Sequence, residues 1–284
     1  MKYKIALAQI DSVIGDVKTN VRKHAQFVRK AKKAGASLVV FPELSLSGYS
    51  LKDLTWDVAL RKVDRDLLKA LIDESGDISI LAGAVEESPE FGIHNAALLF
   101  ERKNLATVHR KIYPPTYGMF EELRYFSGGK SVRSFDSIVG RVGVLICEDL
   151  WHLPLPYLLA KDGARVIFGM AASPARLAAG EKELQIARVN TDQHKAYARL
   201  LSTYIVFCNR VGVEDGISFW GGSEVISPSG DVIIQAKLFD EEMVFAVIDE
   251  NEIRRARRFS RHFLDDDVHL VSRELRRMSR EKYS

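Results

Sequence analysis

The chain has 284 residues, of which 46% are hydrophobic and 28% charged, so it can bury a sizeable core as one layered domain or as two smaller ones. A net charge of +3 is too small to indicate nucleic-acid binding, and the longest apolar runs, such as 142–147, are far shorter than the roughly 20 residues of a membrane-spanning helix. The start MKYKIALAQID has no secretory h-region and two cysteines cannot build a disulfide framework, so we expect a cytoplasmic protein without nucleic-acid or membrane partners.

The first half of the chain alternates β-branched runs with segments of helical spacing. Strands are predicted at 4–10, 37–41, 78–85, 96–100 and 106–112, and helices at 20–34 and 60–74. Gly35 ends the first helix. Glu43 lies just beyond the second strand, and Lys111 closes the fifth.

The second half continues the pattern, with strands predicted at 142–149, 165–170, 204–209, 223–228, 231–236 and 244–249, and a long helix at 181–200. No linker and no internal repeat divides the chain, which favours a single α/β domain over residues 1–250. Residues 251–284 form a C-terminal basic extension, which we interpret as a solvated helix face or a contact between subunits.

Three chemically useful residues, Glu43, Lys111 and Cys147, each stand at the end of an apolar run. Open α/β sheets collect their sites at the carboxyl ends of strands, so the three side chains are expected to converge. A cysteine needs a base or a cation to become a thiolate, and Glu43 and Lys111 supply those groups. From the residues alone, a packing role for Cys147 is equally probable.

Three longer segments resemble the nitrilase superfamily of carbon-nitrogen hydrolases. They are FPELSLSGY around Glu43, HRKIYPPTYGMFEELRYFSGG around Lys111 and VGVLICEDLWH around Cys147. Three further segments also match in the order usual for that family: IHNAALLF before Lys111, FCNRVG after the predicted long helix, and GGSEVISPSGDVI near the end. The resemblance implies a four-layer αββα sandwich with two mixed sheets face to face and helices outside, and a homo-oligomer.

The resemblance also implies a role for each residue. Cys147 attacks an amide carbonyl, Glu43 acts as general base and general acid, and Lys111 holds the oxyanion together with the backbone N–H of Glu148. Glu122 is expected to support Lys111, in preference to its neighbour Glu121. Water then hydrolyses the thioester, and no metal or organic cofactor is required.

Substrate contacts are predicted for Tyr117, Glu148, Trp151 and Ser173. A packing role suits Tyr117 equally well. His152 is expected to lie at the surface or beside the site in preference to contacting the substrate. Ser173 follows Ala171 and Ala172, where relatives carry an Asn-Ala-Ser element, so the mode of recognition stays open. Cys208 is expected to be a packing residue, the histidines lack zinc-site spacing, and the SGGKS segment lacks the phosphate-loop pattern.

CEDLW and YGMFEELRYF look most like the glutamine-hydrolysing domain of glutamine-dependent NAD synthetase. The synthetase half of such enzymes needs its own nucleotide-binding domain, which we do not expect within these 284 residues. The predicted function is cleavage of a small non-peptide amide. A glutaminase subunit that passes ammonia to a separate synthetase is the alternative, and a nitrile substrate is less favoured. A non-catalytic scaffold on the same fold is disfavoured because Glu43, Lys111 and Cys147 occur together.

Overall fold

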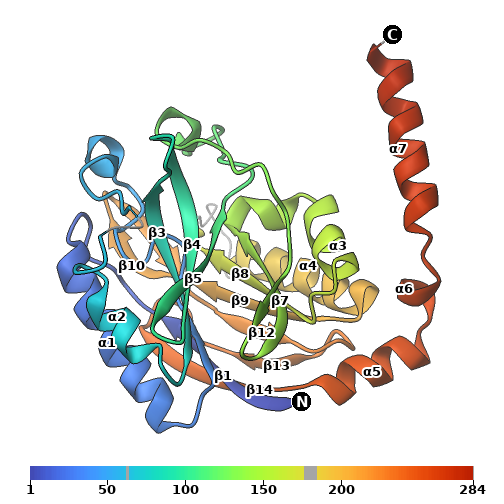
Figure 1. The fold of residues 1–284 in the computed structure, drawn as a ribbon, viewed down its shortest axis with the longest axis horizontal. Coiled ribbons are helices and arrows are strands. Elements are labelled where there is room, and N and C mark those ends of the chain that lie inside the picture. The colour runs from blue at the N-terminus through green and yellow to red at the C-terminus, as the bar shows by residue number, and fades with distance from the viewer. Residues whose placement is uncertain (62–63, 176–183, 284) are drawn as a thin grey trace.

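Two six-stranded mixed sheets form the centre of the molecule. In the computed structural model, residues 1–61, 64–175 and 184–283 are described (Figure 1). In each sheet three neighbouring strands run parallel, β1, β2 and β3 in the first and β7, β8 and β9 in the second, and antiparallel strands flank them. The first sheet has the order β14 (Glu242–Asp249), β1 (Lys2–Gln9), β2 (Leu38–Val40), β3 (Ser79–Glu87), β4 (Ile93–Glu101), β5 (Asn104–Arg110). The second has the order β13 (Val232–Gln235), β12 (Glu224–Ile226), β9 (Tyr204–Asn209), β8 (Val166–Ala171), β7 (Gly140–Ile146), β6 (Phe135–Ser137).

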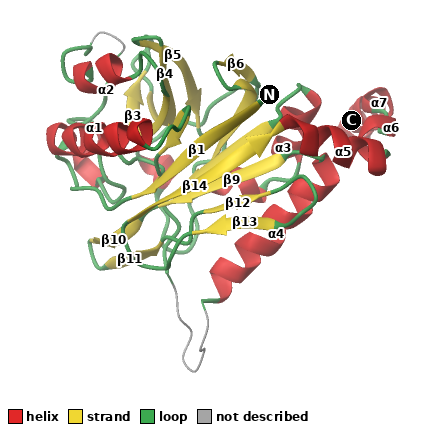
Figure 2. Ribbon diagram, turned by 90° about the horizontal axis from the view of Figure 1, so that it is seen from below, coloured by secondary structure: helices red, strands yellow, loops and turns green. Residues whose placement is uncertain are grey.

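Helices cover both outer faces of the paired sheets (Figures 1 and 2). α1 (Val17–Lys33) and α2 (Lys69–Glu74) lie on the first sheet, and α3 (Pro154–Lys161) and α4 (Gln185–Leu201) lie on the second. α1 begins where the Asp16 side chain accepts a hydrogen bond from the Thr19 backbone N–H, and three lysines occupy its last turn, where the helix dipole favours cations. No helix in the described part of the chain is long and apolar enough to cross a membrane.

Among the described residues the core has three apolar clusters, which correspond to the interfaces between four layers. Ile5, Val40 and Leu81 of the first sheet pack against Val144 and Phe168 of the second. Each sheet also has its own cluster with the helices that cover it. The predicted four-layer αββα sandwich is thereby confirmed.

The helix predicted at 60–74 is wrong over its first half. The Leu60 backbone N–H donates to Val85 O at 2.9 Å, and Leu60 O accepts from Glu87 N at 3.0 Å, so residue 60 continues the sheet. Residues 62 and 63 lie outside the described residues, and regular helix begins only at Lys69. Tertiary pairing with β3 therefore overrides the local helical spacing.

Other differences concern boundaries and short elements. The strands predicted at 106–112 and 142–149 end at Arg110 and Ile146, and residues 181–183 of the predicted long helix lie outside the described residues. β6, α3 and the hairpin of β10 (Val211–Glu214) and β11 (Ile217–Trp220) are elements that were not predicted. Three short 3₁₀ turns, η1 (Lys52–Thr55), η2 (Glu122–Arg124) and η3 (Cys147–Trp151), lie in connections.

The chain after residue 249 forms three helices, α5 (Glu250–Phe259), α6 (His262–Asp265) and α7 (Val268–Tyr283). Ile253 of α5 and Phe263 of α6 are buried against the sandwich, whereas α7 extends away from it (Figure 1). The extension is thus anchored at its start, and its last helix presents side chains to solvent.

Candidate active site

Glu43 follows β2 at the carboxyl end of the parallel strands. The buried carboxylate accepts hydrogen bonds from Asn95 Nδ2 at 2.8 Å and Lys111 Nζ at 2.7 Å through Oε1, and from the Ala172 backbone N–H at 2.8 Å through Oε2. The segment 42–44 fits against Gly83 of β3, where a Cβ atom would stand 2.3 Å from the Leu44 nitrogen. The glycine therefore allows the close approach that places Glu43.

Lys111 follows β5 and carries a buried ammonium group between two carboxylates. Its side chain is 1% exposed, and Nζ donates to Glu43 Oε1 and to Glu122 Oε1, both at 2.7 Å. Burial lowers the pKa of Lys111, but the charges of Glu122 and Glu43 outweigh it and hold the pKa well above its ordinary value. The lysine is a fixed cation at neutral pH.

Cys147 stands at the junction of β7 and η3, where the backbone turns sharply. Its φ of 48° lies in the left-handed region, which is uncommon for a residue with a side chain and which often marks a functional position. Burial and the Glu43 carboxylate raise the pKa of the thiol well above its ordinary value, while Lys111 and the Ala172 N–H lower it in part. The resting thiol is therefore protonated, and attack on a substrate requires a base such as Glu43.

Glu122 opens η2 and completes the charged cluster. Its Oε1 accepts from Tyr49 Oη at 2.6 Å as well as from Lys111. Burial raises the pKa of Glu122 to about 7, although Lys111 works in the opposite direction, and the Glu43 charge adds to the rise. The structure thus brings together Glu43, Lys111, Cys147 and Glu122.

The remaining predicted residues lie around this cluster. Tyr117 is 59% exposed and donates from Oη to Glu148 Oε2 at 2.7 Å, while His152 Nε2 lies 3.6 Å from Glu148 Oε1 and stacks on Tyr113. Trp151 ends η3 with 43% of its surface exposed. The Glu148 carboxylate, with the Tyr117 phenol and the His152 imidazole beside it, forms a polar rim next to Cys147.

Ser173 follows β8 and the Ala172 amide that contacts Glu43. Its backbone N–H donates to Asn209 Oδ1 at 2.8 Å, and Asn209 Nδ2 donates to Gly221 O at 3.0 Å. These hydrogen bonds fix the segment 171–173 opposite Glu43.

Three residues that contact the cluster, Asn95, Tyr49 and Ala172, were not predicted from the sequence. The segments IHNAALLF and FPELSLSGY each contain a polar side chain that contacts a carboxylate of the cluster: Asn95 binds Glu43, and Tyr49 binds Glu122. A usable signal was present in β4, because Asn95 is a polar residue inside an otherwise largely apolar, buried strand and such groups need a partner. Ala172 acts through its backbone, for which the sequence has no signal.

Cys208 is completely buried between the sheets, with its sulfur 3.4 Å from Val40 O and 3.7 Å from Ala8 O. Within the described residues, no group of three or more His, Cys, Asp and Glu side chains is arranged to hold a metal ion.

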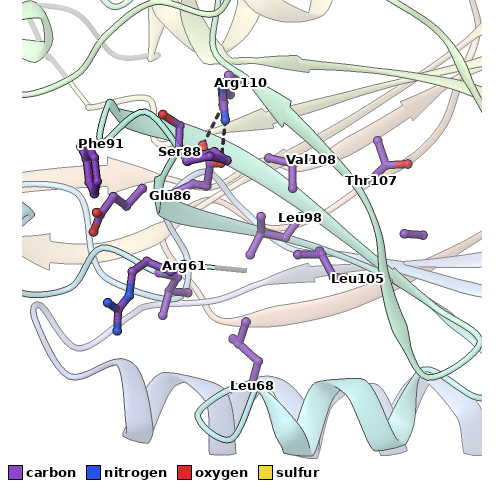
Figure 3. A pocket seen from close by; sticks show the side chains of 14 residues that line it. Arg61, Leu68, Glu86, Ser88, Phe91, Leu98, Leu105, Thr107, Val108 and Arg110 are labelled. Carbon is purple, nitrogen blue, oxygen red and sulfur yellow. Dashed lines mark hydrogen bonds and ion pairs between the residues drawn. The ribbon is translucent and has the colours of Figure 1, made fainter. Parts of the chain in front are cut away.

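A separate cavity of about 510 Å³ opens on the outer side of β4 and β5, near the segment that precedes α2 (Figure 3). Leu68, Leu98 and Leu105 line it, and two of its charged residues, Glu86 and Arg110, are joined by hydrogen bonds of 2.7 and 2.8 Å. None of the four clustered residues lines this cavity, so it is not part of the candidate active site.

Comparison with known proteins gives matches over most of the chain. A family model described as carbon-nitrogen hydrolase matches residues 4–258. Glutamine-dependent NAD(+) synthetases of Thermotoga maritima and Acinetobacter baylyi are each 32% identical, over 88% and 89% of this chain but only 43% and 45% of their own lengths. The chain therefore spans less than half of these curated relatives.

Solved structures agree with the fold. Glutamine-dependent NAD+ synthetase from Acinetobacter baumannii superposes with a TM-score of 0.79 at 28% identity, covering 89% of this chain and 47% of that one. A carbon-nitrogen hydrolase from Helicobacter pylori superposes with a TM-score of 0.85 at 22% identity, covering 97% of this chain and 99% of that one. At that identity the second likeness concerns the fold alone.

Proposed function

The chain belongs to the carbon-nitrogen hydrolase family, and from this premise we propose that it hydrolyses a small non-peptide amide through a thioester on Cys147. The observation that carries the proposal is the buried cluster in which Lys111 bridges Glu43 and Glu122 beside the protonated Cys147 thiol. A buried cation between two carboxylates is costly to assemble, and such clusters with perturbed pKa values concentrate at functional sites.

In the first half-reaction, Glu43 takes the proton of the Cys147 thiol while the sulfur forms a bond to the carbonyl carbon. The resulting oxyanion is stabilised by the Lys111 ammonium group and by the backbone N–H of Glu148 in the first turn of η3. Glu43 then returns the proton to the leaving nitrogen, the carbon-nitrogen bond breaks, and ammonia or an amine departs.

In the second half-reaction, Glu43 removes a proton from water, and the oxygen attacks the thioester carbon. The carbon-sulfur bond breaks, the carboxylic acid leaves, and the thiolate of Cys147 recovers its proton from Glu43. The three hydrogen bonds that Glu43 accepts keep its carboxylate in one place through both steps. Glu122 and Tyr49 keep Lys111 in the matching position.

We propose glutamine as the first substrate to test. The rim carboxylate Glu148, held by Tyr117, lies one residue from the nucleophile and suits an ammonium group such as that of an amino acid. Trp151 and Ser173 are the other proposed substrate contacts. The two curated relatives named above are described as glutamine-dependent, which supports the same choice and the proposal that a separate synthetase accepts the ammonia.

The test is ammonia release from a panel of small amides that includes glutamine, with and without an ammonia-dependent synthetase. Cys147→Ala should abolish turnover, whereas Cys208→Ala, at a buried thiol whose sulfur contacts the carbonyls of Ala8 and Val40, should retain it. Equal turnover by wild type and Cys147→Ala would refute the mechanism. Activity that requires the synthetase identifies a glutaminase subunit, and independent activity identifies an amidase. A stable complex without turnover would instead indicate a scaffold.

We also propose residues 1–250 as the catalytic domain and 251–284 as an extension that contacts a second copy of the chain. An apolar groove of about 600 Å³ between α3, α4, α6 and α7 supports this, because exposed Leu153, Leu200 and Leu275 line it. The two cysteines are free thiols, which fits the reducing cytoplasm that we propose as the location.

A further inference from the structure

Asp149 is a buried carboxylate two residues beyond Cys147 that is not one of the four clustered residues. It has no exposed surface and lies in the first turn of η3. Oδ1 accepts from the backbone N–H groups of Ile112 at 3.0 Å and Tyr113 at 2.9 Å, and Oδ2 accepts from that of Ile146 at 3.2 Å. One side chain thus binds the residues that directly follow Lys111 and the residue that directly precedes Cys147.

These hydrogen bonds cross between the two sheets. Lys111 follows β5 of the first sheet, and Cys147 follows β7 of the second, so the two catalytic residues belong to different layers of the sandwich. A carboxylate that accepts backbone N–H groups from both segments fixes their separation directly, without relying on side chains of the cluster itself.

We infer that Asp149 is a positioning residue that joins the Lys111 segment to the Cys147 segment, and so sets the distance between the oxyanion-binding ammonium group and the nucleophile. The inference rests on the proposed function for its effect on turnover. Asp149 touches no reacting atom in this scheme and acts only through the backbone of the residues that it binds.

His109 of β5 lies near Asp149 but does not form a hydrogen bond with its carboxylate, and this strengthens the inference. Its buried Nε2 lies 4.0 Å from Asp149 Oδ2, beyond hydrogen-bond distance, and has no hydrogen-bond partner among the described residues. Burial lowers the pKa of His109 to about 4, so at neutral pH it is an uncharged neighbour. The carboxylate is therefore held by the N–H groups of the two catalytic segments.

The experiment compares Asp149→Asn with Glu101→Gln. Glu101 is another buried carboxylate, which accepts hydrogen bonds from Ser79, Ser137 and the Ile138 backbone, away from the cluster. Asparagine has one acceptor oxygen, so its amide N–H₂ must face one of the backbone donors. The kcat of folded Asp149→Asn should fall about 100-fold with KM within about threefold, the loss typical of a displacement near 1 Å, whereas Glu101→Gln should keep its kcat.

Alkylation of Cys147 by iodoacetamide provides a second measurement that needs no amide turnover. The thiolate forms beside Lys111 and Glu43, so a displaced segment should slow alkylation about tenfold in Asp149→Asn and leave it unchanged in Glu101→Gln. If the wild type hydrolyses no amide in the panel, the proposed function fails, and alkylation still decides the role of Asp149.

The inference is overturned if folded Asp149→Asn has wild-type kcat and alkylation rates, or if Glu101→Gln loses as much of both. Should Asp149→Asn fail to fold, Asp149→Glu replaces it, because that variant retains the charge but displaces the carboxylate by one methylene. A reduced kcat with unchanged KM in Asp149→Glu supports the role, and an unchanged kcat overturns it.

Discussion

Replacing Gly83 by alanine should displace Glu43, the proposed catalytic base, without changing its carboxylate chemically. The added Cβ would stand 2.3 Å from Leu44 N, 2.4 Å from Pro42 O and 2.8 Å from the carbonyl carbon of Glu43, all of them backbone atoms. Ordinary contact begins at 3.4 Å, so the segment 42–44 must retreat by about 1 Å. The same movement stretches the 2.7 Å hydrogen bond from Lys111 to Glu43 past the usual range.

The expected result is a fall in kcat of about 100-fold, because displacements of this size misalign reacting groups, and a loss of about 1 to 3 kcal/mol in unfolding free energy from overpacking. Ammonia release at saturating amide measures the first quantity, and denaturant unfolding measures the second. Gly76→Ala is the matched control, since its Cβ would meet only the flexible end of Lys103 at 3.2 Å. A folded Gly83→Ala variant with kcat within about threefold of wild type would refute the assignment of Glu43 as base.

Four further variants test the hydrogen bonds around the cluster and the C-terminal extension. Tyr49→Phe removes the 2.6 Å hydrogen bond to Glu122, so kcat should fall about tenfold and stability by about 1 kcal/mol; an unchanged kcat in the ammonia assay would contradict the support of Lys111 by Glu122. Tyr117→Phe frees the Glu148 carboxylate and should raise KM for glutamine about fivefold at constant kcat, and a constant KM would exclude Tyr117 from recognition. The pKa of Glu122 is raised to about 7, so the folded protein binds a proton there at a pH where the unfolded chain does not. On acidification from pH 7 to pH 5 the unfolding free energy of wild type, measured by denaturant titration, should rise by about 2 kcal/mol relative to that of Glu122→Gln. A fall of the wild-type value relative to that of Glu122→Gln over this range would contradict a raised pKa of Glu122. Deleting residues 268–284, and with them α7, should shift the protein to a smaller species on size-exclusion chromatography while kcat stays unchanged, and identical elution would remove α7 from the interface.

The layered fold could be predicted because its strands are short runs of Val, Ile, Leu and Ala separated by helical spacing. The polar residues at the ends of three of those runs, Glu43, Lys111 and Cys147, are brought together by the structure as predicted. The convergence of these residues was predicted from the rule that parallel strands place their carboxyl ends at one edge of a sheet, and each of the two sheets follows this rule.

The features that were predicted wrongly or not predicted depend on contacts between residues that are distant in the sequence. Leu60 pairs with Glu86 in the sheet, which local spacing cannot reveal. Ala172 reaches Glu43 across 129 residues, and its contribution is a backbone N–H that any residue would have. Such contacts become visible only when the two sheets are docked.

The hairpin of β10 and β11 was missed although its signal was present. Asp215 and Gly216 connect the two strands and have φ values of 50° and 77°, and Asp-Gly between apolar segments is a strong short-range indication of a hairpin. This hairpin matters for the site, because Glu214 accepts the backbone N–H of Tyr49 at 2.7 Å and so steadies the residue that binds Glu122.

Because Glu43 and Lys111 follow strands of one sheet and Cys147 follows a strand of the other, the proposed catalytic group is assembled only while the two sheets stay docked in register. A shift of one sheet relative to the other would abolish turnover before either sheet lost its strands. Turnover should therefore report a loss of docking between the two sheets, whereas circular dichroism reports only the strands of each sheet and the helices that cover it. Mild denaturant should accordingly inactivate the protein at lower concentration than it unfolds it.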